Sequence, residues 1–319
     1  MSEPWHTPIL VAIGSTLPAQ WCQAFFIFLS SGVLAVAVTP TNARRHLLDY
    51  GARSSVTKTE RPENNAHDDW FTKLIATLTA WGQVPHSWFR YFYTTSLACS
   101  FFWLAQYLTN GRLLEFLATK QAALSDTQSS MAPGQVVLVW TMMVLQASRR
   151  IYEHATFIKP SKSKMWCVHW LLGLSFYLCM SVSLWIEGSQ SIMNRSLTIF
   201  DTRSYSIKTG GALLAYLFAW VNQYRCHKHL AGLKKYSLPE EGMFRYLICP
   251  HYTCECLLYL AMAIYGAPNG ALFNKTLLCG LIFIVTNLGV TAAGTRKWYM
   301  DRFGEEAVKT RWSMIPFLF

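Results

Sequence analysis

The chain has 319 residues, of which 52% are apolar or aromatic and only 14% are charged, whereas soluble domains carry about a quarter charged residues. Its net charge of +11 is not that of a nucleic-acid-binding protein, because the basic residues flank apolar stretches, which indicates membrane orientation and anionic ligands. The composition excludes an ordinary soluble domain and predicts a membrane protein made of helices, since a backbone in lipid must satisfy its hydrogen bonds within its own segment.

Seven apolar stretches have about the length that a helix needs to cross a bilayer. They lie at residues 21–38, 91–108, 135–147, 166–186, 210–224, 252–265 and 277–293. The third, fifth and sixth are short or carry polar residues, so six spans are the alternative. We therefore expect an all-α integral membrane protein with about seven transmembrane helices, forming one membrane domain over residues 1–319.

Two further predictions concern the residues that precede the second apolar stretch. The first 20 residues contain no Lys or Arg, so we expect the first stretch to be a retained anchor rather than part of a cleaved signal peptide. Residues 39–90 form the longest polar segment and are expected to be a cytosolic loop, with a strongly polar part at 57–69. Within it, residues 70–81 show helical apolar spacing, which predicts a helix lying in the membrane interface.

The distribution of basic residues predicts an orientation. With seven spans and an N-terminus outside the cytosol, 22 of the 28 Lys and Arg residues fall on one side of the membrane. By the positive-inside rule that side is the cytosol, which also places the C-terminus there. The glycosylation sequon Asn194-Arg195-Ser196 falls in a predicted lumenal loop, as this orientation requires.

Motif searches exclude several kinds of site. Most of the nine cysteines lie within or beside apolar stretches, which favours reduced, packing residues. The Cys and His residues between 226 and 256 have no zinc-type spacing, so we expect no metal site. The chain has no GxGxxG, GxxxxGK[ST] or GxSxG motif. A phosphorylated cofactor would therefore be held by the helix bundle and its cytosolic basic clusters.

Ionisable residues near apolar stretches are the most informative ones, because burying a charge in a membrane costs several kcal/mol unless it has a partner. They gather at residues 146–154, 222–234, 249–255 and 296–299. A basic residue at a helix end also has a plain interfacial role, since its side chain can reach the headgroups. Glu255 differs, because it lies four residues into the sixth stretch and needs a hydrogen-bonded partner or a wet cavity.

Five short motifs follow one another near the predicted span boundaries of residues 84–319. They are Val84-Pro85-His86-Ser87-Trp88-Phe89, Gln146 with Arg149-Arg150-Ile151-Tyr152-Glu153, Gln223-Tyr224-Arg225-Cys226-His227, Pro250-His251-Tyr252 with Glu255, and Lys297-Trp298-Tyr299 with the C-terminal Ile315-Pro316-Phe317-Leu318-Phe319. In this order they resemble the steroid 5α-reductase family. The first two resemble its polyprenol reductase branch rather than its steroid enzymes.

The resemblance implies a reductase of the endoplasmic-reticulum membrane, with NADPH held in the cytosolic half of a seven-helix bundle. The expected reaction saturates the α-isoprene double bond of a polyprenoid, a long-chain isoprenoid lipid, and so supports dolichol synthesis for N-glycosylation. By position, the residues expected to bind the cofactor are Asn222, Lys234, His251, Glu255 and Tyr299, and Arg150 is expected to pair with its phosphates as Lys234 does. The family's Arg is Lys at 234, its Asn is His at 251, and a frequent His is Thr at 295.

Chemical reactivity narrows the expected substrate. Hydride adds readily to a carbon–carbon double bond only when a conjugated carbonyl withdraws electrons, so polyprenal is favoured over polyprenol. The developing enolate needs a proton donor. The candidates are Tyr93, Tyr152 and Tyr252, with Glu153 as a partner, and the sequence does not rank them.

Three alternatives remain open at this point. A steroid or another terpenoid enone offers the same conjugated group, and the sequence does not fix the size of the substrate. An isoprenylcysteine methyltransferase-like enzyme would use S-adenosylmethionine, but its usual paired histidines are replaced here by Gly294-Thr295-Arg296. A non-catalytic scaffold or carrier would have no need of the polar residues that gather at the span ends. The oligomeric state is not determined by the sequence.

Overall fold

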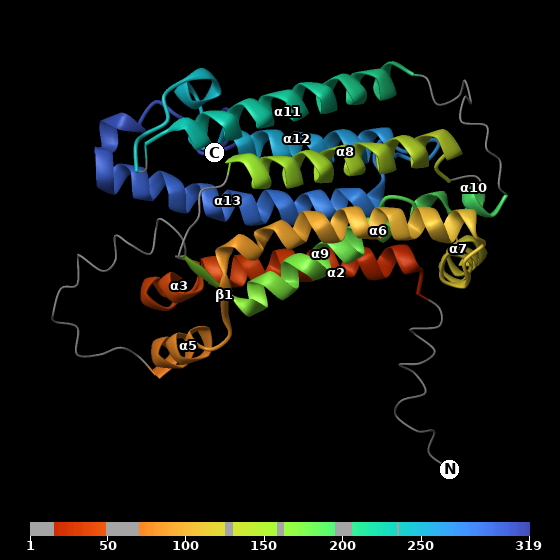
Figure 1. Cartoon of the computed structure of the whole chain (residues 1–319), viewed down its shortest axis with the longest axis horizontal. Coiled ribbons are helices and arrows are strands. Elements are labelled where there is room, and N and C mark those ends of the chain that lie inside the picture. Colours follow the sequence, from red (N-terminus) through yellow and green to blue (C-terminus); the bar gives the residue numbers. More distant parts are fainter. Residues whose placement is uncertain (1–15, 49–69, 125–129, 158–162, 195–205, 235) are drawn as a thin grey trace, which may run out of the picture.

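The computed structural model describes residues 16–48, 70–124, 130–157, 163–194, 206–234 and 236–319. Long helices run side by side in an elongated bundle, and each reverses the direction of the one before it (Figure 1). They are α2 (Pro18–Ala37), α6 (Arg90–Leu108), α8 (Pro133–Phe157), α9 (Cys167–Ser183), α11 (Ile207–Gly232), α12 (Pro250–Tyr265) and α13 (Lys275–Phe303).

Each of the seven predicted apolar stretches falls on one of these helices. Three segments are long and apolar enough, by length and composition, to cross a membrane: Pro18–Ala37, Cys167–Met193 and Lys275–Phe303. The mostly helical fold is thus confirmed, with three candidate membrane helices. The total of seven spans, or six, stays a prediction.

The centre of the bundle is an apolar core to which most of the long helices contribute. Phe26 of α2, Met142 of α8, Met180 of α9 and Leu258 of α12 are fully buried there. The apolar stripes of these helices therefore face one another, while many apolar residues on their other faces remain exposed. An outer surface rich in exposed apolar residues is the one expected of helices surrounded by lipid.

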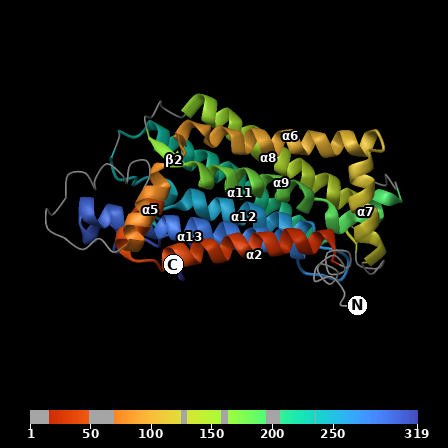
Figure 2. The ribbon, with the colours of Figure 1, turned by 90° about the horizontal axis from the view of Figure 1, so that it is seen from below.

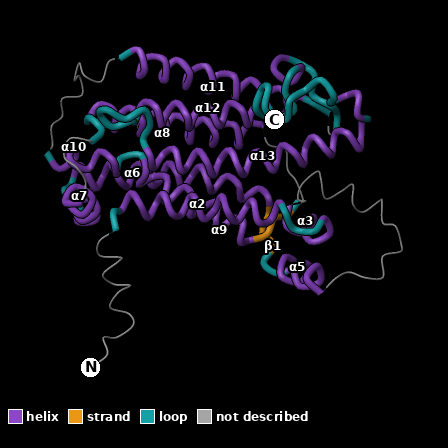
Figure 3. Tube along the Cα trace, turned by 180° about the vertical axis from the view of Figure 1, so that it is seen from behind, coloured by secondary structure: helices purple, strands orange, loops and turns teal. Residues whose placement is uncertain are grey.

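Short elements lie at both ends of the bundle, and two of them differ from the expected all-helical fold. At one end lie α7 (Arg112–Leu124) and α10 (Ser189–Met193); at the other lie α3 (Thr41–Leu48) and α5 (Trp70–Ala80), with α5 crossing the direction of the long helices (Figures 1 and 2). Strand β1 (Gln83–Pro85) pairs antiparallel with β2 (Lys164–Trp166) near α3 and α5 (Figure 3). The all-α prediction missed this ribbon, because strands of three residues show no alternating pattern.

The predicted loop at 39–90 contains α3, α5 and β1, and the helix predicted at 70–81 is confirmed as α5. Its outer face exposes Trp70 by 72% and Leu74 by 45%, although its position in a membrane interface stays a prediction. The polar part at 57–69, the first 15 residues, and Arg195 and Ser196 of the sequon lie outside the described residues. All nine cysteines are free thiols in the structure, as the sequence led us to expect.

Buried polar groups tie the α7–α10 end of the bundle together. Asn274 is fully buried; its Oδ1 accepts from the backbone N–H of Leu277 at 2.9 Å, and its Nδ2 donates to the carbonyl of Gly266 at 3.1 Å. Close by, the Glu187 carboxylate accepts from the Thr276 backbone N–H at 2.7 Å. Asn274 therefore caps α13 and joins it to the end of α12.

We expect Asn274→Ala to lower the free energy of unfolding by about 1–3 kcal/mol, because the buried carbonyl of Gly266 and the first turn of α13 both lose a partner. Thermal unfolding in one detergent measures the change. Thr286→Ala is the matched control, since this exposed hydroxyl bonds only to the carbonyl of Ile282 in its own helix. Equal melting temperatures for the two variants would contradict a capping role.

Candidate active site

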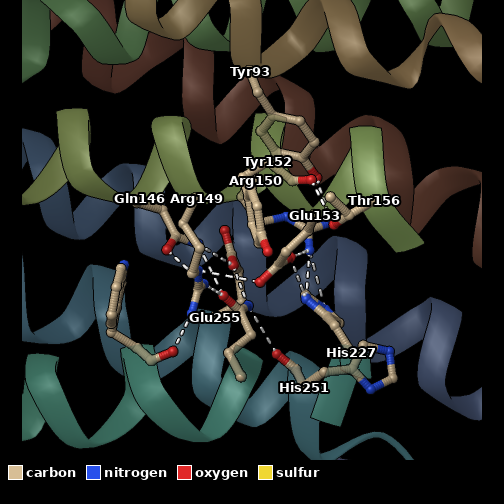
Figure 4. Close-up of polar contacts among 12 residues, drawn as sticks. Tyr93, Gln146, Arg149, Arg150, Tyr152, Glu153, Thr156, His227, His251 and Glu255 are labelled. Atoms are coloured by element: carbon tan, nitrogen blue, oxygen red, sulfur yellow. Dashed lines mark hydrogen bonds and ion pairs between the residues drawn. The ribbon is translucent and has the colours of Figure 1, made fainter. Parts of the chain in front are cut away.

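A cluster of charged and amide side chains lies inside the bundle, where α8, α11 and α12 meet and α6 approaches them (Figure 4). Helix α8 supplies four of its members at intervals of three and four residues, the spacing that places side chains on one helix face. We call the polar cluster the set Tyr93, Gln146, Arg149, Arg150, Glu153, Gln223, His227 and Glu255.

Glu153 is the most buried carboxylate of the polar cluster, with 2% of its surface exposed. Its Oε2 lies 2.7 Å from Nδ1 of His227 and pairs with Arg150, and its Oε1 lies 3.3 Å from Nε of Arg149. Arg149 is itself only 6% exposed. A buried carboxylate of this kind persists because charged partners replace the water that it has lost.

Arg150 connects α8 to α6. Its Nη2 donates a hydrogen bond of 2.9 Å to the hydroxyl oxygen of Tyr93, and its guanidinium carbon lies 4.9 Å from the centre of the Tyr93 ring. Because the Tyr93 oxygen accepts this bond, its O–H hydrogen is directed elsewhere and can donate to a ligand. Arg150 thus orients a tyrosine hydroxyl beside the buried carboxylate of Glu153.

Two glutamines bridge the remaining charges. The Gln146 amide donates to Glu255 Oε2 at 3.0 Å, and the Gln223 amide donates to the same oxygen and, at 3.1 Å, to the carbonyl of His251. Arg149 Nη2 donates to the side-chain oxygen of Gln146 at 2.7 Å and to that of Gln223. The need of Glu255 for a hydrogen-bonded partner, inferred from its position in an apolar stretch, is met by these amides.

The polar cluster is electrically balanced. It contains two guanidinium groups, Arg149 and Arg150, and two carboxylates, Glu153 and Glu255, so its formal charge is zero when His227 is neutral. A balanced set of this kind is suited to hold a neutral polar group, such as an amide or a ribose. It is less suited to the phosphates of a cofactor, for which the exposed Lys234 just beyond α11 is better placed.

The polar cluster contains four of the ten sequence-predicted site residues: Tyr93, Arg150 and Glu153, which contact one another, and Glu255, which joins them through the glutamines and Arg149. A fifth, His251, adjoins them, since its carbonyl accepts from Gln223 and its ring centre lies 5.6 Å from that of His227. Nδ1 of His251 is buried without a hydrogen-bond partner among the described residues, which leaves one polar atom next to the polar cluster available to a ligand.

The other five predicted residues lie outside the polar cluster. Tyr152 is 54% exposed, and Lys234 is exposed just beyond the end of α11. Asn222 donates to the carbonyl of Phe218 in its own helix. Tyr252 and Tyr299 pack in a separate apolar core that the C-terminal segment completes through Val308 and Met314.

Four members of the polar cluster are not among the site residues predicted from the sequence: Gln146, Arg149, Gln223 and His227. The sequence does contain a pattern that points to them, because all four occur in the motifs quoted above. Gln146, Arg149, Arg150 and Glu153 repeat at the period of one helix face, as do Gln223 and His227. Asn222, which is predicted by its position to bind the cofactor, is rotated about 100° around the helix from Gln223.

Comparison with known proteins confirms the family resemblance. Residues 190–319 match the family model described as 3-oxo-5-alpha-steroid 4-dehydrogenase. The chain is similar to Polyprenal reductase of Drosophila melanogaster, with 28% identity over 76% of this chain and 78% of that protein. It is similar to Polyprenal reductase 1 of Oryza sativa subsp. indica, with 27% identity over 93% of this chain and 96% of that protein. It is also similar to Polyprenal reductase of Saccharomyces cerevisiae, with 25% identity over 92% of each chain.

Proposed function

We propose that this chain, a relative of the steroid 5α-reductases, is an oxidoreductase that saturates the α-isoprene double bond of polyprenal to give dolichal, a step of dolichol synthesis. The observation that carries the proposal is the polar cluster, which holds a tyrosine hydroxyl, two buried arginines and two carboxylates inside a lipid-facing bundle. Similarity to polyprenal reductases over 93% of the chain supports the same substrate.

The reaction adds a hydride to the β-carbon of an enal and a proton to the α-carbon. When bound, NADPH would supply the hydride. As it arrives, the double-bond electrons move toward the aldehyde oxygen, which becomes negative and needs a hydrogen-bond donor. The Tyr93 hydroxyl, fixed by Arg150, is the donor that we assign to this oxygen, and Glu153 holds Arg150 in place. The α-carbon then takes its proton from water as the enolate returns to the aldehyde.

Because the polar cluster has no net charge, we expect its residues to bind the neutral polar groups of the cofactor. Glu255 and Gln223 offer an acceptor and a donor side by side, which match a carboxamide or a pair of ribose hydroxyls. Nδ1 of His251 adds one more polar atom at the same place. Lys234, exposed past the end of α11, is available to pair with a phosphate.

The position of the polar cluster along the helices relates the proposed reaction to the two sides of the membrane. The polar cluster lies toward the helix ends that carry the four basic segments, which the positive-inside rule assigns to the cytosol. A cofactor would then enter from the cytosolic side, and a long isoprenoid would approach from within the bilayer. We place the chain in the endoplasmic-reticulum membrane with a cytosolic C-terminus, as the family resemblance implies.

The substrate is tested by offering purified protein and NADPH three compounds in turn: polyprenal, polyprenol and a 3-oxo-Δ4 steroid. We expect NADPH oxidation with polyprenal, because polyprenol has no carbonyl to withdraw electrons. Reduction of polyprenol with polyprenal untouched would contradict the proposed chemistry. The steroid is included because the matching family model is described by a steroid activity, so a faster reaction with it would favour that second function.

Two of the proton-donor candidates, Tyr93 and Tyr152, are expected to differ in how their substitution by phenylalanine affects kcat. Tyr93→Phe should lower kcat by about 10²-fold or more, the usual contribution of a positioned acid. Tyr152→Phe should leave kcat within about twofold, since the Tyr152 side chain is 54% exposed and Tyr93 is the tyrosine that Arg150 holds. Steady-state kinetics with polyprenal measure both. A large loss in Tyr152→Phe, with Tyr93→Phe active, would reassign the donor.

A further inference from the structure

One face of α11 points out of the bundle and is apolar over much of the helix. Leu214, Leu217, Phe218 and Val221 are exposed by 70%, 46%, 57% and 40%. Each lies three or four residues from another of the four, so they form a single stripe. In a helix that crosses a membrane, such a stripe contacts lipid chains.

Toward the end of α11 the same stripe becomes basic. Arg225 and Lys228 follow Val221 by four and seven residues and are both exposed. At 1.5 Å per residue they lie about 6 and 10 Å further along the helix axis. The headgroup region of each leaflet is roughly 5–8 Å thick, so the two cations reach headgroup depth when Val221 lies at the edge of the hydrocarbon.

The two cations border a shallow depression that is open to the surroundings. A depression of about 460 Å³ is lined by Arg225, Lys228, His229, Gly232, Leu233 and Glu241. Glu241 belongs to its rim, since its side chain is 80% exposed and its carboxylate lies 3.5 Å from the His229 ring. A basic residue that merely extends toward headgroups does not require a concave site around it.

We infer that this depression binds the phosphate of an anionic phospholipid of the cytosolic leaflet, whose acyl chains lie along the apolar stripe of α11. The two cations match the negative charge of the headgroup, and basic residues near an anionic membrane surface are attracted to it. Gln223 and His227 lie on a different face of α11, toward the polar cluster. The inference therefore stands or falls independently of the proposed reductase activity.

The test uses the full-length protein in nanodiscs of mixed phosphatidylcholine and phosphatidylserine, followed by native mass spectrometry of the released protein. We expect one phosphatidylserine to be retained per chain, in preference to phosphatidylcholine. The double variant Arg225→Gln/Lys228→Gln should lose this lipid by about tenfold or more. The control Lys297→Gln/Lys309→Gln, which removes the same charge from exposed sites on or just after α13, should retain it.

Three results would overturn the inference. Equal loss of phosphatidylserine in the control variant would show a diffuse effect of net charge. Equal retention of phosphatidylcholine by the unmodified protein would show that the site does not select a headgroup. If inorganic phosphate alone raised the melting temperature as much as phosphatidylserine does, the depression would be a site for soluble anions. Thermal unfolding in pure phosphatidylcholine nanodiscs checks that the Arg225→Gln/Lys228→Gln protein is folded.

Discussion

Glu255→Gln should lower the affinity for NADPH by roughly 10- to 150-fold, the loss expected when a charged hydrogen-bond acceptor worth 1.5–3 kcal/mol is removed. The Glu255 carboxylate accepts from the amides of Gln146 and Gln223, and we place it against a polar group of the cofactor. A glutamine has the same shape, but it carries no charge and replaces one of the two acceptor oxygens by a donating NH2 group, so the charged acceptor at this point is lost.

A fluorescence titration with NADPH measures the effect, and the melting temperature of the ligand-free variant shows whether it is folded. Glu306→Gln is the matched control, because its carboxylate is 86% exposed and pairs only with Lys309 on the surface. An unchanged dissociation constant for a well-folded Glu255→Gln protein would remove Glu255 from the cofactor site.

The second large effect is on stability. Glu153→Gln should lower the free energy of unfolding by about 3–5 kcal/mol, because it leaves the guanidinium of Arg149, only 6% exposed, as an unpaired buried charge. For a protein of this size that corresponds to a fall of roughly 6–20 °C in melting temperature. Thermal unfolding in a single detergent is the measurement.

A double substitution separates this charge effect from a loss of packing. Arg149→Met/Glu153→Leu removes the carboxylate together with its most buried partner, and it should recover part of the stability that Glu153→Gln loses. Arg150 remains in this variant, but its side chain is 18% exposed and keeps its hydrogen bond to the Tyr93 hydroxyl. If the double variant were as unstable as the sum of its two single variants, Glu153 and Arg149 would not be energetically coupled.

The arrangement of the helices was largely predictable from the sequence, because an apolar stretch in lipid has few alternatives to a helix. Each predicted stretch lies on a helix, and α5 begins at Trp70 as its apolar spacing indicated. The ribbon of β1 and β2 was not predictable. Its six residues pair through backbone contacts between segments about 80 positions apart, and Gln83 faces Trp166 without a matching pattern in either segment.

The polar cluster was predictable only in part. Glu255 was identified because a carboxylate within an apolar stretch requires a partner, and Glu153 and Arg150 were identified from their motif. The partners themselves depend on which helices become neighbours, and no local pattern shows that Gln223 of α11 meets Gln146 of α8. Tyr299 was assigned to the cofactor site from a motif position, yet its side chain packs in the separate C-terminal core.

The central claim is that hydride from NADPH reaches the carbon–carbon double bond of polyprenal and not its aldehyde carbon. The most direct measurement is the position of the label in the product after reaction with NADPH carrying deuterium on its transferable position. We predict one deuterium on the β-carbon of dolichal, with the aldehyde intact. Deuterium on the first carbon of polyprenol, with the double bond retained, would show that the enzyme reduces the carbonyl and would contradict the account.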